Sequence, residues 1–496
     1  MTFKLLAVDL GAESGRAILG AFDGERITLE EVHRFPNTTV PLPDGLHWDA
    51  LNLWGEIRKA LGQAAALTGG RLDGVGIDTW GVDFGLLDKH GALLGNPYHY
   101  RDARTDGMLE LAFQHVPKAE IFAQTGIQFM QLNTLYQLLS MATRNSPQLA
   151  AAETFLTMPD LLNYWLTGHM ACEFTNATTT QCYDTRRKAW AQPLLERLGI
   201  PTSIFPEVIS PGTVLGALRG AVAEEVNLPE LPVIAPACHD TASAVAAVPA
   251  GEENYAWISS GTWSIVGVNV REPVITAESL ACDMTNEGGA NQTVCLSKNI
   301  MGLWLVQESR RTWQRQDNAA ISYDDLTRQA AAAQPLRSVV DPDHNDFLKP
   351  GDMPARVRAY CLRTHQPVPE TRGAVVRCLL EGMALKYRWV LERLERLTGT
   401  RVETLHIVGG GTQNKLLSQL AADACQRRVI TGPVEATATG NLLVQAVALG
   451  KIGSYDEARE VVRRSFDVQT FDPNPSVCPA WDEAFGKLEA LMDENC

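Results

Sequence analysis

The chain has 496 residues, of which 45% are hydrophobic and 20% are charged, and its formal net charge is −15. This length suggests two to four domains, and the composition is that of a globular protein rather than a disordered or fibrous one. The acidic balance argues against a protein whose main task is to bind nucleic acid or an anionic membrane.

The N-terminal apolar stretch reaches Asp9 after only a few residues, which is too short for the apolar segment of a signal peptide. The least charged long window, 231–251, contains three prolines, so we expect a buried strand and a helix start there rather than a membrane span. We therefore expect a cytoplasmic protein. The cysteines include no Cys-x-x-Cys pair, which argues against a zinc ribbon, while Cys361 and Cys378 could meet as a disulfide although the cytosol disfavours one.

The first half of the chain begins with strand patterns joined by small-residue turns. Alternating and continuous apolar runs predict strands and helical spacing predicts a helix. In chain order we expect strands at 5–8, 16–22 and 26–32, a helix at 48–67, and strands at 74–78 and 82–87. Three antiparallel strands followed by alternating helices and strands is the order of a ribonuclease-H-like α/β unit.

A similar opening recurs past the middle of the chain. The expected elements are strands at 255–259 and 263–270, helices at 300–314 and 374–397, and a strand at 404–408. Two similar halves predict a duplicated α/β fold with a cleft between the halves. We place the boundary near 245–255, where a Pro-Ala-Gly sequence breaks the pattern, and expect domains at 1–246 and 247–496.

Two small-residue turns are candidate phosphate sites. The first runs from Asp9 to Arg16, where an apolar strand ends at a carboxylate that suits Mg²⁺ and the turn can offer backbone N–H groups to an anion. The second, 259–263, follows the first strand of the second half. Either turn alone could be an ordinary hairpin turn. Because the two turns open two similar halves, together they indicate a site that binds a polyphosphate from both sides.

The sequence His239-Asp240-Thr241 follows the expected strand 233–238 and precedes a helical run. Asp240 there could be a general base that takes a proton from a hydroxyl during phosphoryl transfer. It could also be a helix N-cap, or one half of a His-Asp metal pair. The residues themselves leave these three readings open.

Two further turns have the residues of a ligand site. Asp78, Trp80, Gly81 and Asp83 combine carboxylates with an aromatic ring, as sugar sites do, although paired carboxylates also occur in glycoside hydrolases and at capped turns. The run 409–411 is three glycines between a strand and a helix, which permits close approach of a nucleotide but lacks the dinucleotide-binding spacing.

Taken together, these motifs make the chain resemble the carbohydrate-kinase family that includes glycerol kinase and xylulokinase, and within it the bacterial rhamnulokinase group. The resembling segments run almost end to end. They are VDLGAESGR (8–16), GIDTWGVDF (76–84), YRDART (100–105), GIQFMQLNTLYQL (126–138), MPD (158–160), FTNATTTQ (174–181), HDTASAV (239–245), SSGTWS (259–264), NIMGLWLVQE (299–308), LHIVGGGTQN (405–414) and GPVEATATGN (432–441).

The resemblance implies two actin-like (ribonuclease-H-like) domains around an active-site cleft, and the reaction of ATP with L-rhamnulose to give L-rhamnulose 1-phosphate and ADP. It implies Asp240 as the base, Asp9 as the residue that orients Mg²⁺, and small-molecule partners rather than nucleic acid or membrane. The implied substrate contacts are Gly81, His239, Asp240 and Thr241. The implied nucleotide contacts are Ala12, Glu13, Ser14, Gly15, Arg16, Thr262, Asn299, Gln307 and Gly410.

The first loop departs from the wider family pattern, in which Thr is common at the position of Ala12. Backbone N–H groups must therefore serve there, and we expect Glu13 to point away from the phosphate. A kinase for another ketose or deoxysugar, such as fuculose or xylulose, is the nearest alternative. An actin-like ATPase and a sugar-responsive repressor are more distant ones, for which the chain lacks a charged tail and an N-terminal helix-turn-helix.

Overall fold

The computed structural model describes residues 2–228, 230–251 and 253–493. The chain forms two compact units, each built from several segments. The first unit comprises Met1–Pro249, Asn269–Leu296 and Glu435–Phe466, and the second comprises Ala250–Val268, Ser297–Val434 and Asp467–Cys496. The expected boundary near residue 246 lies close to the end of the first segment, and two later segments also pack with the first unit. Both units are α/β.

The first unit is centred on a mixed sheet with the strand order β13-β14-β6-β1-β2-β3. Strand β1 pairs antiparallel with β2 and parallel with β6, and β6 pairs parallel with β14. The strands are β1 (Phe3–Leu10), β2 (Ser14–Phe22), β3 (Ile27–Pro36), β6 (Gly74–Thr79), β13 (Thr213–Ala217) and β14 (Pro232–Ala235). The expected antiparallel opening, followed by parallel strands, is therefore present.

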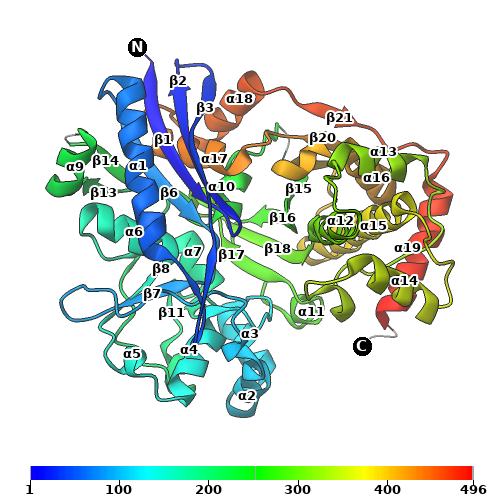
Figure 1. Cartoon of the computed structure of the whole chain (residues 1–496), viewed down its shortest axis with the longest axis horizontal. Coiled ribbons are helices and arrows are strands. Elements are labelled where there is room, and N and C mark those ends of the chain that lie inside the picture. The colour runs from blue at the N-terminus through cyan, green and yellow to red at the C-terminus, as the bar shows by residue number, and fades with distance from the viewer. Residues whose placement is uncertain (1, 229, 252, 494–496) are drawn as a thin grey trace. The chain divides into compact units, whose positions relative to one another are not determined.

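Strand β1 contains a continuous run of buried residues, so both of its faces are packed against other elements. Leu6 and Val8 belong to the core shared with α1 (Ala50–Thr68), whereas Leu5 and Ala7 face α17 (Ala436–Ala448) and α18 (Tyr455–Ser465). Helix α1, in blue, runs beside β1, and the orange helices α17 and α18 lie beside the same sheet (Figure 1). Helices from opposite ends of the chain thus cover the two faces of one sheet.

The rest of the first unit is a second core formed mainly by short helices and small strands. These elements are β7 (Phe84–Leu87), α2 (Met108–His115), α3 (Lys118–Thr125), α4 (Thr134–Thr143), β8 (Thr154–Thr157), α6 (Met158–Thr167), α7 (Phe174–Thr179) and α8 (Gln192–Arg197). Helix α10 (Asp240–Ala246) follows β14 and packs against α17, and β17 (Thr285–Gly288) also belongs to this unit.

The second unit repeats the pairing pattern of the first. Its strands run in the order β18-β16-β15-β19-β20-β21. Strand β15 pairs antiparallel with β16 and parallel with β19, and β19 pairs parallel with β20. The elements are β15 (Tyr255–Ser260), β16 (Trp263–Val270), β18 (Val294–Met301), α12 (Trp304–Asp317), α13 (Tyr323–Ala332), α14 (Met353–Arg363), α15 (Arg372–Thr398), β19 (Thr404–Val408), α16 (Lys415–Cys425), β20 (Arg428–Thr431), β21 (Gln469–Phe471) and α19 (Cys478–Asp493).

Two further expectations concern the cysteines and the membrane. Every cysteine up to Cys478 is a free thiol, and Cys361 and Cys378 are hydrogen-bonded neighbours without a disulfide; Cys496 lies outside the described residues. Over the described residues, none of the helices combines the length and the apolar character that a membrane crossing requires.

Candidate active site

Three carboxyl groups meet at one end of the sheet of the first unit. Asp9 and Asp78 are register partners at the ends of the parallel strands β1 and β6. Asp240 is the first residue of α10. Burial is the main cause that raises the pKa of Asp78 well above its ordinary value, and the nearby charges of Asp9 and Asp240 raise it further. Carboxyl ends of parallel strands are the usual place for ligands in α/β folds.

Asp240 is partly buried among groups that define its chemistry, with 32% of its side chain exposed. Burial, followed by the charge of Asp9, raises its pKa to about 7. Its Oδ1 accepts a hydrogen bond from the Thr241 hydroxyl at 3.1 Å and lies 3.4 Å from Nε2 of His239. The N-cap reading of Asp240 is wrong, because His239 occupies the N-cap position of α10 and Asp240 is already inside the helix.

Arg16 is held between two carboxylates rather than directed toward an open space. Its Nη2 lies 2.7 Å from Oδ2 of Asp9, and its Nη1 lies 2.9 Å from Oε2 of Glu435. Burial lowers the pKa of Arg16, but Asp9 and Glu435 outweigh it, so the guanidinium stays charged. Arg16 is one of the nucleotide contacts that the resemblance implies, but its positive charge is already balanced within the protein.

The turn between β1 and β2 is held by hydrogen bonds of its own backbone and of Asn37. The Gly11 N–H donates to the Ser14 carbonyl at 3.0 Å, and the Asn37 side chain donates to the Gly11 carbonyl at 2.9 Å. Glu13 is exposed, and its carbonyl accepts the Asn37 N–H at 3.0 Å. Gly15 lies so close to the ring of Phe35 that an added Cβ would be 2.4 Å away, so only glycine fits.

The carboxyl groups at this edge have the chemistry of a magnesium site. Oδ2 of Asp78 accepts a hydrogen bond from Asn441 at 2.6 Å, while its buried Oδ1 has no hydrogen-bond partner within the described part of the chain. In that same part, no group of three or more His, Cys, Asp or Glu side chains is arranged to hold a metal ion by itself. Mg²⁺ usually keeps several waters and binds one or two carboxylates plus phosphate, so Asp9 and Asp78 fit such an ion.

The turn after β6 separates two carboxylates that the sequence had placed together. Asp83 is buried, and its Oδ2 accepts the indole N–H groups of Trp48 at 2.6 Å and Trp80 at 2.9 Å. Its Oδ1 accepts the Gln137 amide at 2.8 Å, and burial raises its pKa to about 6. Asp83 therefore holds two tryptophans in place, which leaves it unsuited to a glycosidase pair with Asp78.

Residue Gly81 lies in a strained turn against α7. A Cβ at Gly81 would be 2.9 Å from the Thr179 hydroxyl oxygen, and the next residue, Val82, has a φ of 68°. A positive φ at a β-branched residue is an outlier that costs about 1–3 kcal/mol and clusters at functional sites. The Val82 N–H donates to the Thr179 hydroxyl at 3.0 Å, and its carbonyl accepts the Thr134 hydroxyl at 2.5 Å, so side chains on both sides hold the conformation.

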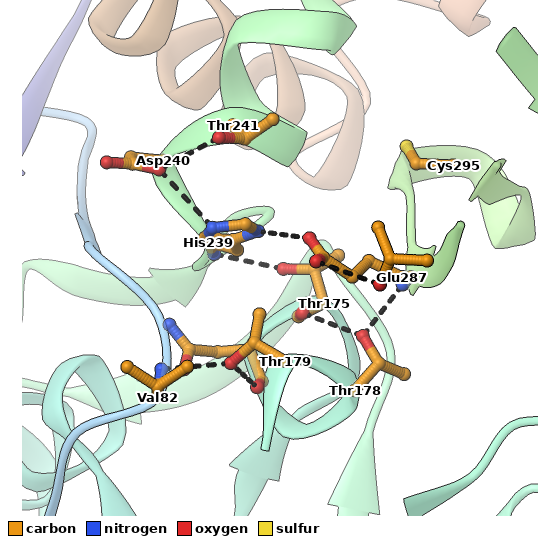
Figure 2. Close-up of polar contacts among 12 residues, drawn as sticks. Val82, Thr175, Thr178, Thr179, His239, Asp240, Thr241, Glu287 and Cys295 are labelled. Atoms are coloured by element: carbon orange, nitrogen blue, oxygen red, sulfur yellow. Dashed lines mark hydrogen bonds and ion pairs between the residues drawn. The ribbon is translucent and has the colours of Figure 1, made fainter. Parts of the chain in front are cut away.

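Sequence reasoning missed two glutamates beside His239. Nδ1 of His239 lies 3.3 Å from a carboxylate oxygen of Glu287, and burial lowers the pKa of His239 while Glu287 opposes that shift. Glu173 accepts the Cys238 N–H at 3.0 Å, and burial raises its pKa to about 8. Figure 2 shows His239 with Asp240 on one side and Glu287 on the other. In the sequence, only the polar segment 174–181 indicated this region, and no function was assigned to its residues.

The expected nucleotide residues Thr262, Asn299, Gln307 and Gly410 all belong to the second unit. The carbonyl of Thr262 accepts the Trp304 N–H at 3.1 Å, so the turn after β15 lies at the start of α12, which carries Gln307 one turn later. Gly411 approaches the end of β15 so closely that a Cβ would lie 2.0 Å from the Ser260 hydroxyl oxygen. Open space surrounds Gly410 instead. The unit thus gathers its turn, glycine loop and α12 at one end of its sheet, while Asn299 is on β18.

Comparisons with known proteins agree with this architecture. The FGGY family of carbohydrate kinases matches over both of its domains, the N-terminal domain at residues 4–247 and the C-terminal domain at 256–449. A rhamnulokinase of Bacteroides thetaiotaomicron is 43% identical over 98% of each chain, and one of Oceanobacillus iheyensis is 40% identical over 94% of this chain and 97% of the relative. The structure of a ligand-bound xylulose kinase from Lactobacillus acidophilus superposes with a TM-score of 0.82 at 15% identity, covering 99% of this chain and 98% of the other.

The comparisons confirm the resemblance inferred from the motifs, and the two-domain α/β fold with it. The carbohydrate kinases of this family use ATP together with a divalent metal ion, usually Mg²⁺. The chain belongs to the FGGY family of carbohydrate kinases.

Proposed function

We propose that this chain transfers the γ-phosphoryl group of ATP to the C1 hydroxyl of L-rhamnulose and releases L-rhamnulose 1-phosphate and ADP. The substrate is chosen from the two rhamnulokinases that match nearly the whole chain at 43% and 40% identity. The observation that carries the chemistry is the partly buried carboxyl group of Asp240, at the start of α10, whose pKa burial and the charge of Asp9 raise to about 7.

Asp240 is the general base of the proposed reaction. As the sugar oxygen bonds to the γ-phosphorus and the bond from phosphorus to the ADP oxygen breaks, Asp240 takes the proton of the sugar hydroxyl. A pKa of about 7 makes it a stronger base than an ordinary aspartate while leaving much of it ionised near neutral pH. Such a base typically contributes about 10²–10⁴-fold to the rate.

The remaining roles concern binding. Asp9 would orient the metal ion, and Mg²⁺ when bound neutralises phosphate charge. Gly81, His239 and Thr241 would contact the sugar. The proposed nucleotide contacts are Ala12, Glu13, Ser14, Gly15, Arg16, Thr262, Asn299, Gln307 and Gly410. With Arg16 balanced by two carboxylates, the first turn would act mainly through its N–H groups. In the same proposal, residues 1–246 and 247–496 are the two actin-like domains.

The test is ADP release measured with ATP and Mg²⁺ against a panel of L-rhamnulose, L-fuculose, D-xylulose, an aldose and glycerol. We expect kcat/KM for L-rhamnulose to exceed that for every other acceptor by at least about tenfold, because hydrogen-bonded hydroxyl groups discriminate strongly. Higher activity on another ketose would replace the substrate, and ADP release that ignores the sugar would contradict the kinase assignment.

A further inference from the structure

Helix α7 links the parts of the first unit on which the proposed reaction depends. Each of its threonines Thr175, Thr178 and Thr179 accepts a backbone N–H from a different distant segment. We propose that α7 is the positioning element of the sugar site, in which Thr175 fixes the base Asp240 and Thr179 fixes the turn that carries Gly81. This inference rests on the function proposed above and names residues for which that function alone gives no role.

Thr175 fixes the backbone directly before Asp240. Its hydroxyl donates to Oε2 of Glu173 at 2.6 Å and accepts the His239 N–H at 3.0 Å. Glu173 in turn accepts the N–H of Cys238 at 3.0 Å. All of these groups are buried. Two consecutive N–H groups before Asp240 are therefore tied to α7, and Figure 2 shows Thr175 below His239.

Thr179 fixes the turn of Gly81. Its hydroxyl donates to the Asn176 carbonyl at 2.8 Å and accepts the Val82 N–H at 3.0 Å. The same side chain limits Gly81, where a Cβ would lie 2.9 Å from its oxygen. This hydroxyl is therefore one of the two, with that of Thr134, that hold the strained φ of Val82.

Thr178 extends the pattern to the segment that carries Glu287. Its hydroxyl accepts the Gly288 N–H at 2.7 Å, next to the carboxylate that faces His239. One buried helix thus holds three segments, at Val82, His239 and Gly288, whose contacts with it span 97, 64 and 110 residues of sequence.

Thr180 provides an internal comparison. It is as buried as its neighbours, and its hydroxyl likewise donates to a carbonyl three residues earlier, that of Ala177, at 2.5 Å. The N–H that it accepts belongs to Cys182, two residues ahead, at 3.1 Å. Removing this hydroxyl also removes one donated and one accepted hydrogen bond, but it releases no segment of the sugar site.

The two positioning roles predict different kinetic defects. Displacing Asp240 changes the chemical step, and displacement of a reacting group by about 1 Å can cost about 10²-fold in rate. Displacing the turn of Gly81 changes how the sugar is held. Loss of the Thr175 hydroxyl should therefore lower kcat, and loss of the Thr179 hydroxyl should raise the KM for the sugar.

The experiment compares Thr175→Val, Thr179→Val and Thr180→Val, which remove a hydroxyl at nearly constant volume, with the Thr→Ser variant at each position. In the full chain with ATP and Mg²⁺, we expect Thr175→Val to lower kcat about 10- to 100-fold and Thr179→Val to raise the KM for L-rhamnulose about tenfold. Thr180→Val should keep both within about twofold, and each Ser variant should stay within about threefold of the unchanged protein. If Thr175→Val does not fold, Thr175→Cys, a weaker acceptor, takes its place.

Equal kinetics for Thr175→Val and Thr180→Val, or Ser variants as defective as the Val variants, would overturn the inference. Hydrogen exchange at the His239 N–H gives a readout that does not depend on turnover, and it should accelerate in Thr175→Val but not in Thr180→Val. Asp240→Asn, assayed alongside, separates the two proposals. An inactive Asp240→Asn with an unaffected Thr175→Val removes only the role of α7, whereas an active Asp240→Asn removes the proposed base.

Discussion

Asp160 is a fully buried carboxyl group whose chemistry follows from its surroundings. Burial raises its pKa to about 7, although Thr157 and the Glu173 N–H at 3.0 Å both hydrogen-bond to it. Between its ordinary pKa of 3.8 and about 7, the folded protein keeps a proton that the unfolded chain has released. Unfolding then releases a proton, so stability falls as pH rises through this window and levels off above it.

Asp160→Asn should therefore flatten the pH dependence of stability. Asparagine resembles the protonated acid, since it can donate to Thr157 and accept the Glu173 N–H. Between pH 5 and 7, we expect the free energy of unfolding of the variant to fall with rising pH less steeply than that of the unchanged protein, by up to about 1.4 kcal/mol per pH unit. At pH 8 we expect the variant to be more stable than the unchanged protein. Urea unfolding at several pH values measures this.

The control is Asp23→Asn at an exposed position, where backbone N–H groups of Arg26 and Glu25 lower the pKa of the aspartate. That variant should leave the slope between pH 5 and 7 unchanged, because Asp23 is ionised in both states across this range. Parallel curves for Asp160→Asn and the unchanged protein would show that Asp160 is ionised in the fold.

At the scale of elements, α10 is placed by a glycine in the helix packed against it. A Cβ at Gly440 of α17 would lie only 1.7 Å from the Ser243 carbonyl oxygen of α10. We expect Gly440→Ala to destabilise the protein by about 1–3 kcal/mol or more, as overpacking does. Because α10 begins with Asp240, kcat should fall as well. Denaturant unfolding and initial rates measure the two effects.

Gly55 is the matched control, in the middle of α1 with no atom within 4 Å of an added Cβ. There alanine should stabilise the protein by up to about 1 kcal/mol, through helix propensity alone. If Gly440→Ala behaved like Gly55→Ala, the close contact between α17 and α10 would be wrong.

The sequence predicted local elements well because their patterns are local. The expected strand at 74–78 is β6 at Gly74–Thr79, and the expected helix at 374–397 is α15 at Arg372–Thr398. The strand expected at 233–238, before Asp240, is β14 at Pro232–Ala235, so it ends three residues earlier than predicted. The expected helix at 300–314 begins later, because 299–301 continue β18 and Gly302 packs on the turn at 262–263.

The contacts around the site were beyond the reach of sequence patterns. Glu173, Thr175 and Glu287 are far from Asp240 in the chain, and neither periodicity nor composition distinguishes them from ordinary polar residues. Asp83 shows the opposite kind of error. The sequence made it a candidate site residue, but its carboxylate accepts hydrogen bonds from two indoles and an amide inside the protein. Partner choice of this kind depends on tertiary packing.

At the scale of the whole molecule, the net charge of −15 sets a condition for binding ATP. An acidic protein whose Arg16 is already balanced must attract a tetra-anion through local N–H groups and a metal ion. We expect EDTA to abolish turnover and Mg²⁺ to restore it. We also expect ATP with Mg²⁺, but not ATP with EDTA, to raise Tm, since a ligand at about 100 times its Kd adds about 2.7 kcal/mol of stability. Turnover that persists in EDTA would contradict a metal-dependent site.

The central claim is that Asp240 acts as the base in phosphoryl transfer, and the most direct test is the kcat of Asp240→Asn with L-rhamnulose. Asparagine keeps the size of the side chain and an acceptor for Thr241 but cannot take the sugar proton. We predict a fall in kcat of about 10²–10⁴-fold, with Tm and the Kd for ATP with Mg²⁺ nearly unchanged. A folded Asp240→Asn protein with kcat within about threefold of the unchanged enzyme would contradict the account.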